Sequence, residues 1–190
     1  MIRATSKDKT KAIAIITETF DANPSVNIVI GAGGNRRKKI SRLASYAFIK
    51  ALNKNGAYLS TNKMGIALCF RSNDKSFSVK EFISELRFAF SIPIKKVVET
   101  LKRESYIKKH RYKGKHLYFW FFGVTKGGNR AAFELKNYIF DYSNKEQLPL
   151  LLETSVQRNK EIYERYGFYV YHEWQNSGGG HTLWFMKRDD

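Results

Sequence analysis

A glycine-bearing turn that follows a long apolar run is the part of this sequence best suited to chemistry. The run at 116–124 reads His-Leu-Tyr-Phe-Trp-Phe-Phe-Gly-Val, and Gly127-Gly128-Asn129 follow it before a segment with helical periodicity. A strand that enters such a turn and continues as a helix directs unpaired backbone N–H groups and the positive end of the helix dipole at one point. That point suits a phosphate group, although an ordinary strand-to-helix connection uses the same residue types.

The other residues able to act as nucleophiles, bases or metal ligands form no recognisable site. The histidines are His110, His116, His172 and His181, and their spacing matches neither a metal site nor a catalytic triad. We therefore expect no metal. Cys69 lies in the apolar run 66–70, which favours a buried structural thiol. Glu153 ends a predicted strand, where a carboxylate is more often hydrogen-bonded structure than a base, so we assign no base.

The charge of the chain favours an anionic partner. With 34 Lys and Arg against 17 Asp and Glu, the formal net charge is +17, which fits a nucleic acid, a membrane surface or a phosphorylated cofactor. The longest basic cluster, Lys102 to Lys115, contains Tyr106 and Tyr112. Cations with interleaved aromatic rings are typical of nucleic-acid surfaces, but they also form solvated helix faces and loops.

Helical periodicity dominates the first half of the chain. Helices are predicted at about 10–20, over an apolar face at 40–51, and from 79 to about 106 with an interruption at Pro93. Between the first two, a loop is predicted. Two short strands, 57–60 and 65–71, form a predicted hairpin.

The second half reads as strand, turn, helix and strand. The apolar run at 116–124 predicts a central strand buried on both faces, and a helix after Asn129 leads to a strand at 149–154. A short helix at 157–166 ends at Gly167. Two closing strands, 168–174 and 181–187, are separated by the glycine-rich segment 176–180. At 190 residues, we expect one domain, 1–190.

From His116 onward the sequence resembles the GNAT superfamily of acetyl-CoA-dependent acyltransferases. Leu152-Glu153-Thr154-Ser155, Arg158-Asn159 and the segment Tyr163 to Phe168 are similar to the family's second CoA-binding segment, in which an Asn precedes a Tyr and then a Gly-Phe pair. Leu183-Trp184-Phe185-Met186 is similar to the last strand of one subgroup. The resemblance implies an α/β (α+β) fold with a mixed, mostly antiparallel central sheet flanked by helices. It assigns 1–115 to a variable acceptor-side half and 116–190 to a cofactor-side half.

The pyrophosphate loop departs from the family pattern of Gln or Arg, two residues, Gly, one residue, then Gly or Ala. Here Arg130 falls where the family has its middle glycine, and only the final small residue, Ala132, is kept. A side chain at that position would weaken or block the approach of the pyrophosphate to the backbone. Alternatively, Arg130 would turn outward and hold a phosphate through a charge-assisted hydrogen bond.

The resemblance also implies roles for individual residues, with acetyl-CoA as cosubstrate. Backbone groups of Phe122, Gly123 and Val124 would hold the pantetheine arm, and an N–H near Val124 would stabilise the oxyanion. Amides of Gly128, Asn129, Arg130, Ala131 and Ala132 would hold the pyrophosphate. Asn159 would bond the cofactor arm, and Tyr163 would protonate the leaving thiolate. From the residues alone, Asn159 also fits a polar helix start and Tyr163 a core aromatic residue, and it is the match to the family spacing that favours the functional roles.

Direct transfer of acetyl to a small amine is the function that these features favour. The acceptor site is expected around 24–35 and 91–96. The alternatives are a non-catalytic CoA-binding or ligand-sensing protein with an impaired phosphate loop, and a basic nucleic-acid-binding protein. The N-terminus has no signal-like apolar core, and no stretch approaches the ~20 apolar residues that cross a bilayer, so we expect a cytoplasmic protein without a membrane partner.

Overall fold

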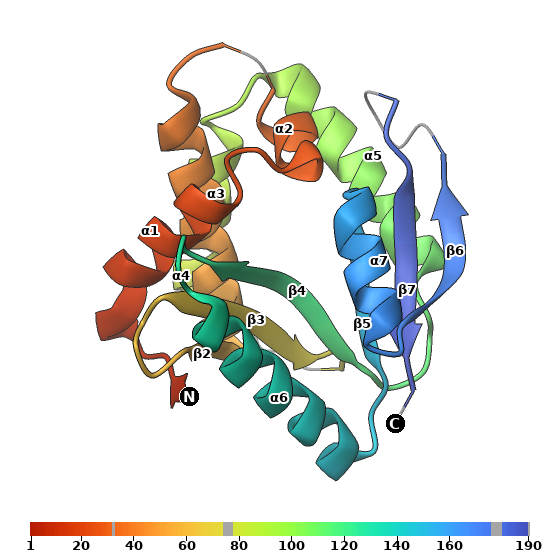
Figure 1. Ribbon diagram of the computed structural model, residues 1–190. Helices are drawn as coiled ribbons and strands as arrows, with labels where there is room; N and C mark the ends of the chain where they lie inside the picture. Colours follow the sequence, from red (N-terminus) through yellow and green to blue (C-terminus); the bar gives the residue numbers. More distant parts are fainter. Residues whose placement is uncertain (32, 74–77, 176–179, 190) are drawn as a thin grey trace.

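A seven-stranded sheet runs through the whole molecule in the order β1-β2-β3-β4-β5-β7-β6 (Figure 1). The computed structural model describes residues 1–31, 33–73, 78–175 and 180–189. The strands are β1 (Ile2–Arg3), β2 (Ala57–Leu59), β3 (Gly65–Arg71), β4 (Leu117–Val124), β5 (Leu150–Thr154), β6 (Tyr169–Trp174) and β7 (Leu183–Arg188). Of the neighbouring pairs, β4 and β5 are parallel and the others antiparallel. The mixed, mostly antiparallel sheet expected from the sequence is confirmed.

Helices cover both faces of this sheet. They are α1 (Lys9–Thr19), α2 (Pro24–Ile30), α3 (Arg36–Asn53), α4 (Val79–Ala89), α5 (Ile94–His110), α6 (Asn129–Glu146) and α7 (Gln157–Arg165), with a 3-10 turn at Ser6–Asp8. As predicted, the helical segment breaks at Pro93, which is the N-cap residue of α5. The glycine-rich segment predicted at 176–180 lies outside the described residues except for Gly180.

The loop predicted between the first two helices was wrong, because α2 occupies Pro24–Ile30. The Asn23 side chain accepts a hydrogen bond from the Val26 N–H, and Pro24 takes the first helical turn, where its missing N–H costs nothing. Val26 and Ile30 are buried against α3 and α4 residues. The β-branched run Val-Asn-Ile-Val-Ile has no clear helical period, so the cap and the tertiary contacts decide this helix.

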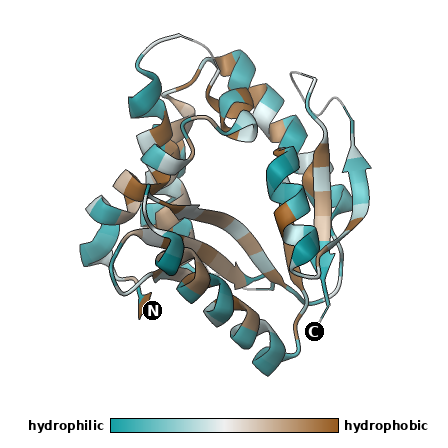
Figure 2. Cartoon of the chain, in the orientation of Figure 1, coloured by the Kyte–Doolittle hydropathy of each residue, from teal (hydrophilic) through white to brown (hydrophobic). Residues whose placement is uncertain are grey.

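The core is divided by the sheet. On one face, α1 and α3 pack Ile15, Ile16 and Phe48 against the central strands. On the other face, α6 packs Leu135 and Ile139. In Figure 2 the hydrophobic colour follows the central strands, whereas the outward sides of the helices are hydrophilic. Cys69 is buried here as predicted, and burial raises the pKa of its thiol.

A β-bulge in β4 changes which face its side chains reach. Leu68 pairs with Phe121 and Cys69 with Phe119, so Trp120 has no partner on β3. Trp120 and Phe121 therefore both pack on the α1–α3 side, while Phe119 and Phe122 pack on the α6 side. The sequence did not predict this change of face. When every residue of a strand is apolar, the sequence does not indicate which side chains point to which face of the sheet.

The two parallel strands separate soon after they meet. β4 and β5 pair only at Leu117 with Leu150 and at Tyr118 with Leu151. Beyond that point β4 stays paired with β3 as far as Val124, and β5 stays paired with β7 as far as Thr154. The facing edges of the two strands thus open into a wedge in the middle of the sheet.

Candidate active-site cleft

A cleft of about 340 Å³ fills the wedge between β4 and β5. Residues 118–122 of β4 form one wall, and residues 152–155 at the end of β5 form the other, continued by α7. Side chains from α2, α3, α4 and α5 close the remaining side. Because residues 119–122 have no ladder partner on β5, the backbone N–H and C=O groups on that edge are free to bond an extended polar ligand.

Three of the sequence-predicted site residues line this cleft: Phe122, Asn159 and Tyr163. Tyr163 lies half-buried on α7, and its ring packs 5.4 Å from that of Phe168. Burial raises the pKa of Tyr163 to about 12, so the phenol carries its proton at neutral pH. A protonated hydroxyl in the cleft is what a general acid requires.

Gly123 and Val124 do not line the cleft. They pair with Ile66 and Gly65 of β3. A Cβ on Gly123 would collide with the Oγ1 atom of Thr19 and lie 3.0 Å from its Cβ, so the end of α1 crosses β4 too closely for a side chain there. The packing of α1 is thus a sufficient reason for this glycine.

The turn after β4 leads directly into α6, as predicted. Gly127 has a φ of +82° and Gly128 is the N-cap residue, without a capping side chain. Asn129, Arg130 and Ala131 are the first residues of the helix, and the Ala132 N–H already bonds the Gly128 carbonyl. A helix start of this kind leaves its first N–H groups available to an anion.

Arg130 is exposed, whereas Ala131, the next residue in the chain, is buried. In the part of the chain that the structure describes, no ion pair involves Arg130. The guanidinium therefore stands in solvent at the first turn of α6. It does not fill the interior beneath the turn.

Glu153 has the structural role that its position suggested. Its carboxylate accepts hydrogen bonds from Arg111, at 2.9 and 3.2 Å, and from the Tyr118 hydroxyl at 2.7 Å. The Glu153 side chain is only 7% exposed. Burial opposes ionisation of Arg111, but Tyr118 and Glu153 outweigh it and raise the Arg111 pKa. Sequence reasoning missed both partners.

The wall opposite α7 carries aromatic and charged side chains that the sequence did not single out. Tyr46 and Trp120 meet edge to face at 6.0 Å, and the Lys50 ammonium lies over both rings while donating to the Tyr46 hydroxyl at 2.8 Å. Burial raises the pKa of Tyr46, and the carboxylates of Glu85, Glu81 and Glu104 add to the shift. Glu85 and Glu104 also line the cleft.

A hydroxyl bridge joins α2 to the end of β5 across the cleft. The Ser25 and Ser155 hydroxyls lie 2.7 Å apart, and Arg103 donates to Ser25 at 3.0 Å. Arg103 is 6% exposed, and burial lowers its pKa. The sequence predicted an acceptor site around 24–35 and 91–96. The residues of these two regions that line the cleft are Ser25, Val26, Val29 and Ile92.

The structure brings together histidines that the sequence treated as scattered. The rings of His110 and His172 stack at 4.4 Å, and the Tyr106 hydroxyl lies 3.1 Å from His172 Nε2.

Among the described residues, no three potential metal ligands lie together. In the same part of the chain, no helix is long and apolar enough to cross a membrane.

Comparison with known proteins identifies solved structures of the same fold. No protein-family model matches the sequence, and no curated protein is significantly similar to it. Solved structures are similar over nearly the whole chain. One is the histone acetyltransferase HPA2 and related acetyltransferase from Corynebacterium glutamicum, with a TM-score of 0.69, 16% identity, and coverage of 100% of this chain and 95% of that one.

Two further structures show the same likeness. Arylalkylamine N-acetyltransferase 2 from Aedes aegypti has a TM-score of 0.64 and 14% identity, covering 99% of this chain and 97% of that one. A putative acetyltransferase of the GNAT family from Desulfovibrio desulfuricans has a TM-score of 0.52 and 10% identity, covering 97% and 94%. The chain therefore has the acyl-CoA N-acyltransferase (GNAT) fold.

Proposed function

We propose that this protein is an N-acyltransferase that moves an acetyl group from acetyl-CoA to the amine of a small acceptor. The observation that carries the proposal is the wedge between β4 and β5, which presents an unpaired strand edge to a cleft also lined by Asn159 and Tyr163. Acetyltransferases with the same fold support it. Fold alone does not fix the reaction, so the proposal rests on the site.

The residues present fit acetyl-CoA in two places. The free edge of β4 around Phe122 offers backbone bonds to the amide groups of a pantetheine arm. The first N–H groups of α6, at Asn129, Arg130 and Ala131, offer a site for the pyrophosphate, with Gly128 keeping the turn tight. A Cβ at Gly128 would lie 2.9 Å from the Thr125 carbonyl oxygen, so this turn requires glycine.

The transfer would proceed in one ternary complex. The acceptor nitrogen attacks the thioester carbonyl carbon, a C–N bond forms and the C–S bond breaks. Tyr163 gives its phenolic proton to the departing thiolate, and the proton that the nitrogen releases to solvent is replaced on the phenolate, which restores Tyr163. Asn159, one turn before Tyr163 on α7, would bond the cofactor arm. Glu153 is not the base, because Arg111 and Tyr118 already engage its carboxylate.

Calorimetric titration with acetyl-CoA tests the proposal, followed by thiol-release assays with a panel of primary amines. We expect micromolar binding that is weakened by Arg130→Glu and retained by Tyr163→Phe, with turnover lost in the second variant. Binding without turnover on any amine would favour the non-catalytic CoA-binding alternative. No binding would remove the acyltransferase proposal altogether.

A further inference from the structure

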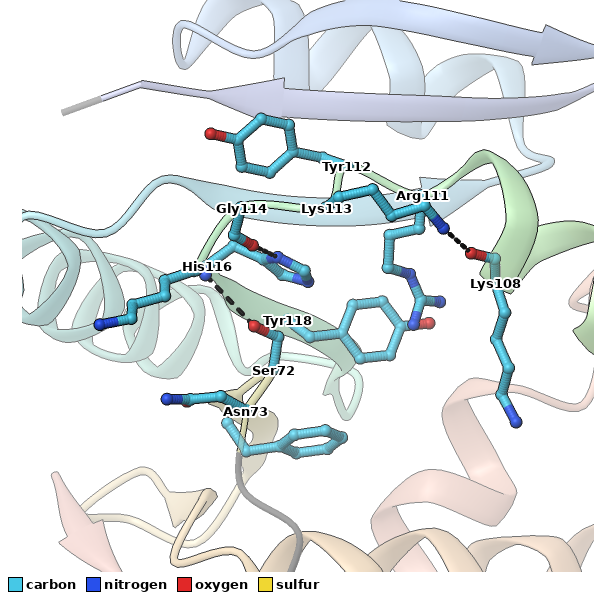
Figure 3. A pocket seen from close by; sticks show the side chains of 11 residues that line it. Ser72, Asn73, Lys108, Arg111, Tyr112, Lys113, Gly114, His116 and Tyr118 are labelled. Carbon is cyan, nitrogen blue, oxygen red and sulfur yellow. Dashed lines mark hydrogen bonds between the residues drawn. The ribbon is translucent and has the colours of Figure 1, made fainter.

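A second pocket, of about 360 Å³, lies where the chain leaves α5 and enters β4 (Figure 3). Residues 111–116 form most of its wall, and Ser72 and Asn73 close it after the end of β3. Figure 3 shows the Arg111 side chain beside the Tyr118 ring, with the His116 ring next to them. This pocket contains the C-terminal part of the basic cluster, of which Lys108 also lines the candidate active-site cleft.

The lining of this pocket is strongly positive. Four cationic side chains belong to it: Lys108, Arg111, Lys113 and Lys115. Arg111 is paired with Glu153, whereas none of the described lining residues is acidic, and Lys113 donates only to the Lys108 carbonyl. Like charges held around one concavity repel each other, and an anion bound between them relieves that repulsion.

His116 gives a second, independent sign of a ligand. The side chain is 5% exposed, and its Nδ1 lies 2.7 Å from the Gly114 carbonyl oxygen, so Nδ1 carries the proton. Nε2 is buried and has no hydrogen-bond partner among the described residues. A buried polar atom without a partner is costly, and a hydroxyl donor on a bound ligand would satisfy it.

The pocket shares Lys108 and Tyr118 with the candidate active-site cleft, but it lies far from the proposed pyrophosphate site at the start of α6. β4 is eight residues long, and at about 3.3 Å per residue its ends lie roughly 23 Å apart. The basic pocket is at the start of β4, while the first turn of α6 follows its end. One phosphate group cannot reach both places.

The arrangement of the aromatic rings favours a small ligand over a nucleic-acid strand. Of the two tyrosines in the basic cluster, Tyr106 is stacked on Trp174 at 3.9 Å and on His110 at 4.2 Å, so its faces are occupied. Tyr112 alone is exposed, at 40%, and it lies at the pocket. A single ring beside a concave cationic site suits one ligand with one phosphate.

We propose that this basic pocket binds the phosphoryl group of a small organic phosphate. Lys113 and Lys115 neutralise the anion, and Lys108 and Arg111 complete the positive wall. The organic part packs against Tyr112 and Phe70, and the P–OH of the monoanion donates to His116 Nε2 when the ring turns out of its buried position toward the ligand. The proposal does not depend on acyltransferase activity.

Calorimetry with phenyl phosphate and with inorganic phosphate, at fixed ionic strength, tests the site and separates an organic phosphate from the free anion. We expect saturable 1:1 binding that is tighter for phenyl phosphate. The double variant Lys113→Gln/Lys115→Gln changes two lining residues that are not part of the candidate active-site cleft, and it should weaken this binding about tenfold or more. The matched control, Lys7→Gln/Lys11→Gln, removes the same charge from exposed positions near α1 and should leave it unchanged.

Three results would overturn the proposal. No saturable binding at millimolar phenyl phosphate would remove the site. Equal weakening in the control variant would assign the binding to the overall field of the +17 chain. If an oligonucleotide binds through Lys113 and Lys115 and phenyl phosphate does not displace it, the cluster is a nucleic-acid surface. His116→Phe removes the Nε2 atom without changing the lysines. If Nε2 accepts a hydrogen bond from the ligand, this variant should also weaken the binding of phenyl phosphate.

Discussion

The Arg111 guanidinium forms a two-point hydrogen bond with the Glu153 carboxylate, 2.9 Å from Nε to Oε1 and 3.2 Å from Nη2 to Oε2. Glu153 lines the candidate active-site cleft and Arg111 lines the basic pocket, so this pair forms part of the wall between the two. The pair also joins the loop before β4 to the end of β5, and it holds the two parallel strands at the point from which they separate.

Loss of one partner of this pair should destabilise the fold. Because both side chains are largely buried, Glu153→Gln leaves an uncompensated guanidinium, and we expect a loss of about 3 kcal/mol in the free energy of unfolding. Urea denaturation measures it. The control is Glu146→Gln, which breaks the more exposed Arg71–Glu146 pair and should cost under about 1 kcal/mol. Equal losses in the two variants would contradict a structural role for Glu153.

Gly123→Ala tests whether the packing of α1 against β4 requires a glycine at this position. The new methyl group would meet Thr19, and overpacking of this kind costs about 1–3 kcal/mol. Thr19→Ala in the same chain removes the clashing hydroxyl, so the double variant should be more stable than the sum of the two single changes indicates. Thermal or urea unfolding of the four proteins completes the cycle. Strict additivity would show that the contact with Thr19 does not determine Gly123.

Much of the architecture could be predicted because it is encoded locally. The apolar run at 116–124 gave the central strand, Pro93 gave the break between α4 and α5, and the glycines at 127–128 gave the start of α6. Each of these signals acts within a few residues. The order of Asn159, Tyr163 and Gly167 is also local, since all three lie on one short helix and its end.

The features that were missed depend on residues far apart in the chain. Arg111 and Glu153 are 42 residues apart, and only the parallel pairing of β4 with β5 brings them together. The bulge at Trp120 is a property of two strands in register, and the orphan Nε2 of His116 depends on how the preceding loop folds back. Local periodicity contains no information on any of these.

Stability should fall at high pH partly because of Tyr163. Its pKa is about 12 in the folded protein against 10.0 as the ordinary value, since burial disfavours the phenolate. Between these two values the unfolded chain releases this proton and the folded chain retains it, so the free energy of unfolding decreases as the pH rises. Tyr163→Phe should lose less stability between pH 9 and pH 11 than the wild type does, as measured by urea denaturation. An identical loss of stability in both proteins would contradict a Tyr163 pKa raised by burial.

Tyr163→Phe also separates chemistry from binding. If Tyr163 protonates the thiolate, its loss should lower kcat by about 100-fold or more and leave the Kd for acetyl-CoA within about twofold. Tyr169→Phe, on an exposed part of β6, is the matched control and should retain activity. If Tyr163→Phe keeps the full kcat, Tyr163 has no catalytic role, and its contact with Phe168 is then a packing contact only.

Arg130 decides between the two alternatives for the altered phosphate loop. Because its side chain is exposed at the first turn of α6, it can reach a bound phosphate without filling the turn, and we expect Arg130→Ala to weaken acetyl-CoA binding about tenfold. Arg130→Lys should retain part of the affinity, since the charge remains but the planar fork is lost. S-acetylpantetheine lacks the pyrophosphate and should bind wild type and Arg130→Ala equally. Tighter binding of acetyl-CoA by Arg130→Ala would show that the side chain obstructs the loop.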